Sequence, residues 1–234
     1  MAADAGGRRA ALEALTAEIV ACRRCPRLVE WREQVAREKV ARFRDEVYWG
    51  LPVPGFGDPD ARILIVGLAP AAHGGNRTGR VFTGDASGDF LFAAMYEVGL
   101  ANQPTSRRAD DGLQLRGAYI AAAVRCAPPA NKPMPVERDT CGPWLDRDLA
   151  LAAPHLRSIL ALGSIAWDAT LAATRRIGWV VPRPKPRFGH GVETTLATAT
   201  GREVRLVASY HVSQQNTFTG KLTEPMLDEV IRRL

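Results

Sequence analysis

The segment Arg62-Ile-Leu-Ile-Val-Gly67 is a short apolar run that ends in glycine, and it decides the fold class. A long glycine-rich loop follows it, and then a segment near 88–99 that has helical spacing, which together predict a strand, loop and helix unit. Three later apolar runs also precede helical segments. They span 119–124, 158–163 and 205–209. Buried strands that alternate with helices are typical of α/β proteins, so we expect a three-layer α/β/α sandwich with a central, mostly parallel four-stranded sheet.

The segments around these strands complete the predicted order of elements. A helix is expected over 9–21, where apolar residues recur at roughly helical spacing, and a second over 28–44, where Arg, Glu and Lys interleave as on a solvated face. A Pro- and Gly-rich loop is expected over 50–57. Further helices are expected near 136–152, near 164–175 and at the C-terminus. Residues 1–234 are therefore predicted to form a single domain, with an N-terminal helical arm over about 1–48.

Composition excludes several classes of protein. The 234 residues are 46% hydrophobic, which is ample for a core and excludes disordered, collagen-like and small disulfide-rich chains. No apolar stretch approaches the ~18 residues that cross a bilayer, and the N-terminus has no signal-peptide core, so we expect a cytoplasmic protein without membrane contact. The net charge of +6 is compatible with a polyanionic partner without establishing one.

The four cysteines form the pattern of a metal site. Cys22 and Cys25 make a CxxC pair in the arm, whereas Cys126 and Cys141 follow the second strand. Disulfides are not expected in a reducing compartment, and four thiolates can hold either zinc or a [4Fe-4S] cluster. Spacing does not separate these two, and buried, unligated cysteines are the third possibility. A closed four-cysteine site would tie the arm to the sheet rather than catalyse a reaction.

The carboxyl ends of parallel strands are where α/β proteins bind ligands, so the loops there are the candidate sites. In the loop 67–88, glycines allow a ligand to approach the backbone, and Arg77 and Arg80 are candidates for phosphate contacts. This loop has neither a Walker motif nor a dinucleotide fingerprint. Asp85 precedes the next helix, where it can cap the helix, act as a general base, or do both.

Two later loops add polar candidates. Asn131 lies among prolines, a position where asparagine is most often a turn former. His211 directly follows the last apolar run, and a lone histidine at a strand end is more often structural than catalytic. The amides and the lysine after it are side chains of the kind that meet DNA backbones and base edges. They are Gln214, Gln215, Asn216 and Lys221.

These motifs, in this order, resemble the uracil-DNA glycosylase superfamily, and most closely its iron–sulfur family 5. The resemblance rests on GlyLeuAlaProAlaAlaHisGly (67–74), ArgValPheThrGlyAspAlaSerGly (80–88), AlaValArgCysAlaProProAlaAsnLysPro (123–133), HisValSerGlnGlnAsn (211–216) and the four cysteines. It implies a monomer with a [4Fe-4S] cluster on the cysteines Cys22, Cys25, Cys126 and Cys141.

The resemblance also implies roles for the site residues. Asp85 would orient the attacking water, His211 would donate a hydrogen bond to the departing base, and Asn131 would position water or base. The substrate would lie against Gly67, Ala69, Phe82 and Ala122, with Phe82 stacking on the base unless it is an ordinary core residue. Arg77, Arg80, Lys221 and the amides Gln214, Gln215 and Asn216 would grip phosphates and wedge the duplex.

Two alanines stand where other members of the superfamily carry polar residues. Ala69 replaces a water-activating Asp or Asn, and Ala122 replaces an Asn that reads uracil. Loss of a polar reader relaxes discrimination. The implied function is a monofunctional DNA N-glycosylase that flips uracil, hypoxanthine or other deaminated bases out of DNA and starts base excision repair. The alternatives are a nonenzymatic four-cysteine, metal-containing nucleic-acid-binding protein and an iron–sulfur electron carrier.

Overall fold

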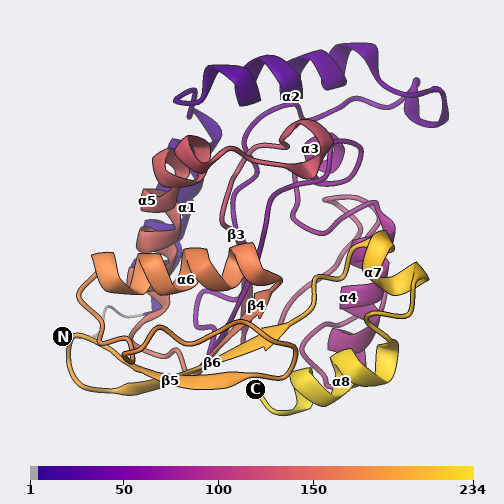
Figure 1. The fold of residues 1–234 in the computed structure, drawn as a ribbon. Helices are drawn as coiled ribbons and strands as arrows, with labels where there is room; N and C mark the ends of the chain where they lie inside the picture. The colour runs from indigo at the N-terminus through magenta and orange to yellow at the C-terminus, as the bar shows by residue number, and fades with distance from the viewer. Residues whose placement is uncertain (1–4) are drawn as a thin grey trace.

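A six-stranded sheet forms the centre of the molecule in the computed structural model, which describes residues 5–234 (Figure 1). The strands follow the order β1-β3-β2-β4-β6-β5, and the four inner ones are parallel. These four are the strands that the apolar runs predict, which confirms the α/β/α fold class. They are β2 (Ile63–Gly67), β3 (Ala118–Ala122), β4 (Ser158–Leu162) and β6 (Glu203–Ser209).

Two antiparallel edge strands correct the expected count of four. β1 (Phe56–Gly57) pairs with β3 and lies in the segment predicted as a loop, and β5 (Glu193–Ala197) pairs with β6. β1 is only two residues long, which is too short for a periodic pattern to predict it. β5 is a half-exposed edge strand with polar residues at its start, and therefore lacks the continuous apolar run that marks the inner strands.

Alternate residues of the inner strands enter two different cores. Ile65 of β2 lies beside Ile120 and Leu160, and all three pack into the core beneath the helices α4 (Ala86–Glu97) and α8 (Glu224–Arg232). Leu64 and Ile159 point to the other face, in the core beneath α5 (Pro135–Ala152) and α6 (Ser164–Arg176). This is the period of two that strand geometry imposes.

The helices cover both faces of the sheet, as Figure 1 shows, with α1, α5 and α6 on one side and α4 and α8 on the other. The expected helices are present, with shifted ends, and the last of them is preceded by the short α7 (Gln214–Phe218). A one-turn helix, α3 (Gly75–Thr78), interrupts the first predicted loop. Within residues 5–234, no helix is both long and apolar enough to cross a membrane.

The arm consists of α1 (Ala5–Val20), α2 (Pro26–Glu38) and the short 3-10 helix η1 (Ala41–Phe43). Leu15 and Ile19 of α1 and Leu28 of α2 are buried in a third core together with Trp144 of α5. Burial of this apolar surface attaches the arm to the α/β unit. Residues 1–4 of the predicted arm lie outside the described residues.

Candidate active site

A pocket of about 570 Å³ opens at the carboxyl edge of the parallel strands. It forms there because β2, β3 and β6 end at the same edge and their following loops surround one space. The structure thus brings together most of the residues singled out from the sequence. The pocket is lined by Gly67, Ala69, Phe82, Asp85, Ala122, Asn131, His211, Gln214 and Gln215.

Asp85 is the N-cap of α4. Its extended backbone places Oδ1 3.0 Å from the backbone nitrogen of Gly88, which donates a hydrogen bond to it. The backbone of Gly74 lies directly against the carboxylate, since a Cβ atom on Gly74 would stand only 1.9 Å from Oδ2 of Asp85. The carboxylate therefore caps a helix, as predicted, and also lines the pocket, whereas its role as a general base stays a prediction.

Burial raises the pKa of Asp85 above the usual value for aspartate, and the negative charge of Asp89 adds to this effect. The hydrogen bonds from the backbone of Gly88 and Ser87, and the cation of Arg77, act in the opposite direction. A desolvated carboxylate that is still held by N–H donors is a stronger base than a solvated one.

Phe82 forms a second wall of the pocket and has a strained backbone, with φ of 49°. A positive φ is costly for a phenylalanine, and such strain is concentrated at functional sites. Its ring also packs on the core beneath α4, so the aromatic is partly a core residue. A Cβ atom on Gly67 would lie 2.7 Å from the ring, so the glycine allows the ring to lie close to the end of β2.

His211 follows β6 and faces Phe82 across the pocket, with 6.2 Å between the ring centroids. Burial lowers the pKa of its imidazole to about 4, so the ring is neutral at pH 7. The side-chain amide of Asn216 donates a hydrogen bond of 2.8 Å to the backbone carbonyl of His211. This bond ties α7 to the strand end and fixes the histidine backbone.

Asn131 ends a short 3-10 turn, η2 (Pro129–Asn131), whose last two residues have φ of 52° and 56°. Left-handed backbone is tolerated best by asparagine and glycine, which explains the turn-forming role of Asn131. The same turn places the residue on the pocket wall. Lys132 joins it there and was not predicted as a site residue, although it belongs to the AsnLysPro motif.

Arg77 and Arg80 correct the expectation that they grip phosphates. Only 6% and 4% of their surfaces are exposed, respectively. Arg77 pairs with Glu46, and Arg80 makes two bonds of 2.8 Å to Asp111. A buried guanidinium that already has a carboxylate partner is not available to DNA. Their burial depends on distant partners, which the local glycine-rich sequence does not reveal.

Asn216 and Lys221 lie beside the main pocket rather than in it. They line an adjoining hollow of about 210 Å³, which shares Leu68 and His211 with the main pocket. The ammonium of Lys221 lies 5.0 Å from the ring centre of Tyr210. A cation and amides therefore extend from the pocket mouth onto the neighbouring surface.

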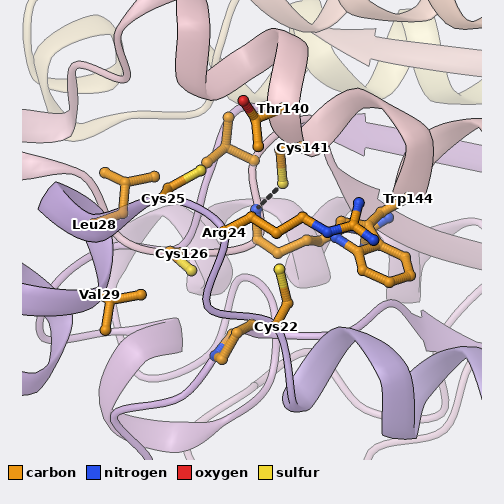
Figure 2. Close-up of a pocket in the computed structure, with 12 residues that line it drawn as sticks. Cys22, Arg24, Cys25, Leu28, Val29, Cys126, Thr140, Cys141 and Trp144 are labelled. Atoms are coloured by element: carbon orange, nitrogen blue, oxygen red, sulfur yellow. Dashed lines mark hydrogen bonds between the residues drawn. The ribbon is translucent and has the colours of Figure 1, made fainter.

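The four cysteines come together at the junction of the arm and the sheet (Figure 2). Cys22 and Cys25 lie between α1 and α2, Cys126 follows β3, and Cys141 lies in α5. None forms a disulfide, and all four line one small pocket with an apolar wall. In the described part of the chain, no three His, Cys, Asp or Glu side chains are grouped to hold a single metal ion.

The surroundings of the sulfurs suit thiolate ligation. The backbone N–H of Arg125 donates to Sγ of Cys141 over 3.2 Å, a bond that stabilises a thiolate. Burial raises the pKa of Cys126 to about 12 and that of Cys141 to about 11, so these thiols are protonated unless a cation replaces the protons. Four free cysteines with an N–H donor, in an apolar wall, fit an iron–sulfur cluster or another thiophilic metal group.

Comparison with protein-family models matches residues 54–234 to the uracil DNA glycosylase superfamily. The chain is 54% identical over 228 residues to a type-5 uracil-DNA glycosylase of Mycobacterium bovis, an alignment that covers 97% of this chain and 82% of the relative. It is 52% identical to the type-5 protein of Mycobacterium leprae, with 97% and 95% covered. Identity to the type-5 protein of Thermus thermophilus is also 52%, with 94% of each chain covered.

Proposed function

The chain belongs to the type-5 group of the uracil DNA glycosylase superfamily, and from this premise we propose that it is a DNA N-glycosylase that hydrolyses uracil from DNA. One observation carries the proposal for this chain. The pocket at the carboxyl edge of the sheet places a desolvated carboxylate, Asp85, and a neutral imidazole, His211, around a wall formed by Phe82. These groups match the two charges that develop when a glycosidic bond breaks.

The substrate base must leave the duplex before the pocket can hold it, at a cost of about a few kcal/mol. Stacking of the flipped base on Phe82 would offset part of this cost, since base–aromatic stacking is worth ~1–3 kcal/mol. Ala69, Ala122 and Gly67 then form a small, apolar floor. A floor without a polar reader would accept hypoxanthine and other deaminated bases as well as uracil.

Bond cleavage leaves an oxocarbenium-like sugar and an anionic base. Asp85 would orient the attacking water, accept its proton and stabilise the sugar cation. His211 would donate a hydrogen bond to the base as negative charge develops on it. Asn131, on the opposite turn, would position the base or the water through its side-chain amide.

Contacts with DNA would come from groups at the rim of the pocket. Gln214 and Gln215 line it, and Asn216 and Lys221 continue along the adjoining hollow. The segment 175–187 also carries five basic and no acidic residues, but it lines neither of these hollows, and within it Arg176 pairs with Asp146 and Lys185 with Asp168. Phosphate contacts release counterions, so we expect binding and activity to weaken as salt rises.

Abasic sites provide the test of this function. Purified protein is incubated with duplexes that contain one uracil, one hypoxanthine or only normal bases, and the strands are then cleaved with alkali. We expect cleavage at the uracil and at the hypoxanthine, and none in the normal duplex. If the protein binds the duplexes but produces no alkali-labile site, the result would instead support a nonenzymatic binding protein. Cleavage at uracil but not at hypoxanthine would contradict the proposed broader substrate range.

We further propose that Cys22, Cys25, Cys126 and Cys141 hold a [4Fe-4S] cluster. The four-cysteine donor set, its location in an apolar wall and the N–H donor to Cys141 support this assignment. When bound, the cluster would act as a structural crosslink between the arm and the sheet, and hydrolysis needs no electron from it.

Replacement of Cys22 by alanine is expected to lower the iron content and the free energy of unfolding, because the arm loses its crosslink to α5 and the strand β3. Iron and sulfide analysis, visible absorption and urea unfolding measure this effect. Thr140→Ala, in the same wall, is the matched control and should keep both iron and stability. Zinc instead of iron in the purified protein would overturn the cluster, and unchanged stability after metal loss would overturn the crosslink.

Gly67→Ala tests the close approach of the glycine to the aromatic wall. The added Cβ would lie 2.7 Å from the ring of Phe82, so the ring must shift and the flipped base loses its stacking surface. We expect single-turnover excision to slow by ~10–100-fold, as misplacement by about 1 Å does in other enzymes. Gly99→Ala is the control, because it adds backbone strain at φ of 76° but touches nothing. Equal losses in both variants would contradict the stacking role.

A further inference from the structure

Arg77 is a buried arginine whose contacts all lead to the walls around Asp85 or to the arm. Its Nε atom donates to the backbone carbonyl of His73 over 2.8 Å, and its Nη2 atom donates to the carbonyl of Gly84 over 2.9 Å. Its remaining nitrogen, Nη1, pairs with Glu46. Three acceptors from three separate segments therefore share one planar guanidinium, a geometry that lysine cannot reproduce.

The two carbonyls belong to the two sides of the Asp85 site. Gly84 directly precedes Asp85 in the chain, so the bond to its carbonyl fixes the backbone that enters the N-cap. His73 directly precedes Gly74, whose backbone lies against the carboxylate of Asp85. Arg77 thus spans the gap between the segment that carries the carboxylate and the segment that confines it.

The third side of Arg77 is formed by the N-terminal arm. The guanidinium lies 3.9 Å from the ring centre of Phe43 at the end of η1, and its partner Glu46 follows the same turn. Stacking and ion pairing together hold the guanidinium plane. The arm therefore reaches the Asp85 site through Phe43 and Glu46, a path separate from the cysteines.

We propose that Arg77 is a positioning residue that sets the place of the Asp85 carboxylate, with Phe43 and Glu46 of the arm as its support. This inference rests on the proposed function, since it gives Asp85 a task that needs exact placement. It replaces the phosphate-binding role that the glycine-rich sequence indicated for Arg77.

The charged groups that face Asp85 come from several elements. Arg77 of α3 favours the ionised form, whereas Asp89 of α4 opposes it. His211 and Lys132 lie on other walls of the same pocket, and the pKa of the histidine, about 4, leaves it neutral from about pH 5 upward. Removal of Arg77 leaves only the hydrogen bonds from the backbone of Gly88 and Ser87 to oppose burial and Asp89, so the pKa of Asp85 should rise and the carboxylate should protonate at a higher pH.

The test compares Arg77→Met and Arg77→Lys with Arg80→Met. Arg80 is also buried and paired with an aspartate, Asp111, but its charge is not among those that shift the pKa of Asp85. We expect Arg77→Met to lower kcat about 10–100-fold with little change in DNA affinity, and to move the acid limb of the pH–rate profile to higher pH. Arg77→Lys keeps the charge without the three bonds, so it should restore the acid limb but not kcat.

A carboxyl titration by carbon NMR, with Asp85 assigned through Asp85→Asn, gives a readout that needs no substrate. If the titration midpoint of Asp85 rises in Arg77→Met and does not rise in Arg80→Met, the proposal is supported. This holds even if the protein excises no base, a result that would overturn only the proposed function. An unchanged midpoint together with unchanged kcat would overturn the proposal. If Arg77→Met does not fold, two variants of the arm take its place in the test. Glu46→Gln and Phe43→Leu each remove one contact that the arm makes with the Arg77 guanidinium. A normal kcat in both variants would overturn the role of the arm.

Discussion

Asp85→Asn is expected to lower the rate of uracil release by about 10²–10⁴-fold, the range for loss of a general base. The amide has nearly the shape of the carboxylate and can still accept the hydrogen bond from Gly88, so the cap of α4 persists. It can neither accept a proton from water nor stabilise the sugar cation. Single-turnover excision of uracil from a duplex measures the loss.

The same substitution should leave the protein as stable at pH 7, or more stable. Burial raises the pKa of Asp85 in the folded protein, so the fold binds this proton more tightly than the unfolded chain does. The free energy of unfolding therefore falls as pH rises from the ordinary pKa of aspartate through the raised one, and the penalty persists at pH 7. An uncharged amide in place of the carboxylate removes that penalty, which urea unfolding at pH 7 can detect.

Asp89→Asn is the matched control for Asp85→Asn. It removes an exposed carboxylate one turn further along α4, and this carboxylate itself raises the pKa of Asp85. We expect nearly full activity and an acid limb shifted slightly to lower pH. Comparable inactivation of both variants would mean that negative charge at this helix start, rather than the Asp85 carboxylate, supports the reaction.

The second large effect is expected at His211. Replacement by alanine removes the donor to the departing base and should slow excision by about 10²–10³-fold, the usual cost of losing one donor to a developing anion. His211→Gln restores an N–H group at the same strand end and should recover part of the loss. His155→Gln, in the turn before β4 and at the opposite edge of the sheet, is the control.

The pH dependence distinguishes a neutral from a charged His211. Its pKa of about 4 lies below the ordinary value for histidine, so the imidazole stays neutral from about pH 5 upward. Activity should therefore show no titration near pH 6.5, and the acid limb should belong to Asp85. If the rate of excision instead fell as pH rose through 6.5, and did so only in proteins that retain His211, the charged imidazolium would be the active form.

The inner sheet could be predicted because its signal is local. Each parallel strand is covered on both faces, so the segments around Ile65, Ile120, Leu160 and Val207 are continuously apolar. The edge strands β1 and β5 carry no such run, because water covers part of each of them. Their pairing depends on neighbours that are distant in sequence, and a local pattern does not encode it.

In the site, too, the residues with a local signal could be predicted and those that depend on distant partners could not. Asp85 and His211 could be located because Asp85 precedes a predicted helix, His211 follows a predicted strand, and parallel strands bring their carboxyl ends together. The burial of Arg77 could not be predicted, since its partners Phe43 and Glu46 lie about thirty residues earlier, at the end of the short helix η1 and in the turn after it. The roles assigned to these residues in catalysis remain predictions.

Release of free uracil tests the central claim most directly. A duplex with one radiolabelled uracil is mixed with excess wild-type protein, Asp85→Asn or Arg80→Met, and free uracil and intact phosphodiester backbone are both quantified. The account predicts one uracil released per duplex by the wild type, with the backbone unbroken until alkali is added, similar release by Arg80→Met, and very slow release by Asp85→Asn. Absence of free uracil with the wild type, or release by Asp85→Asn at the wild-type rate, would contradict the account.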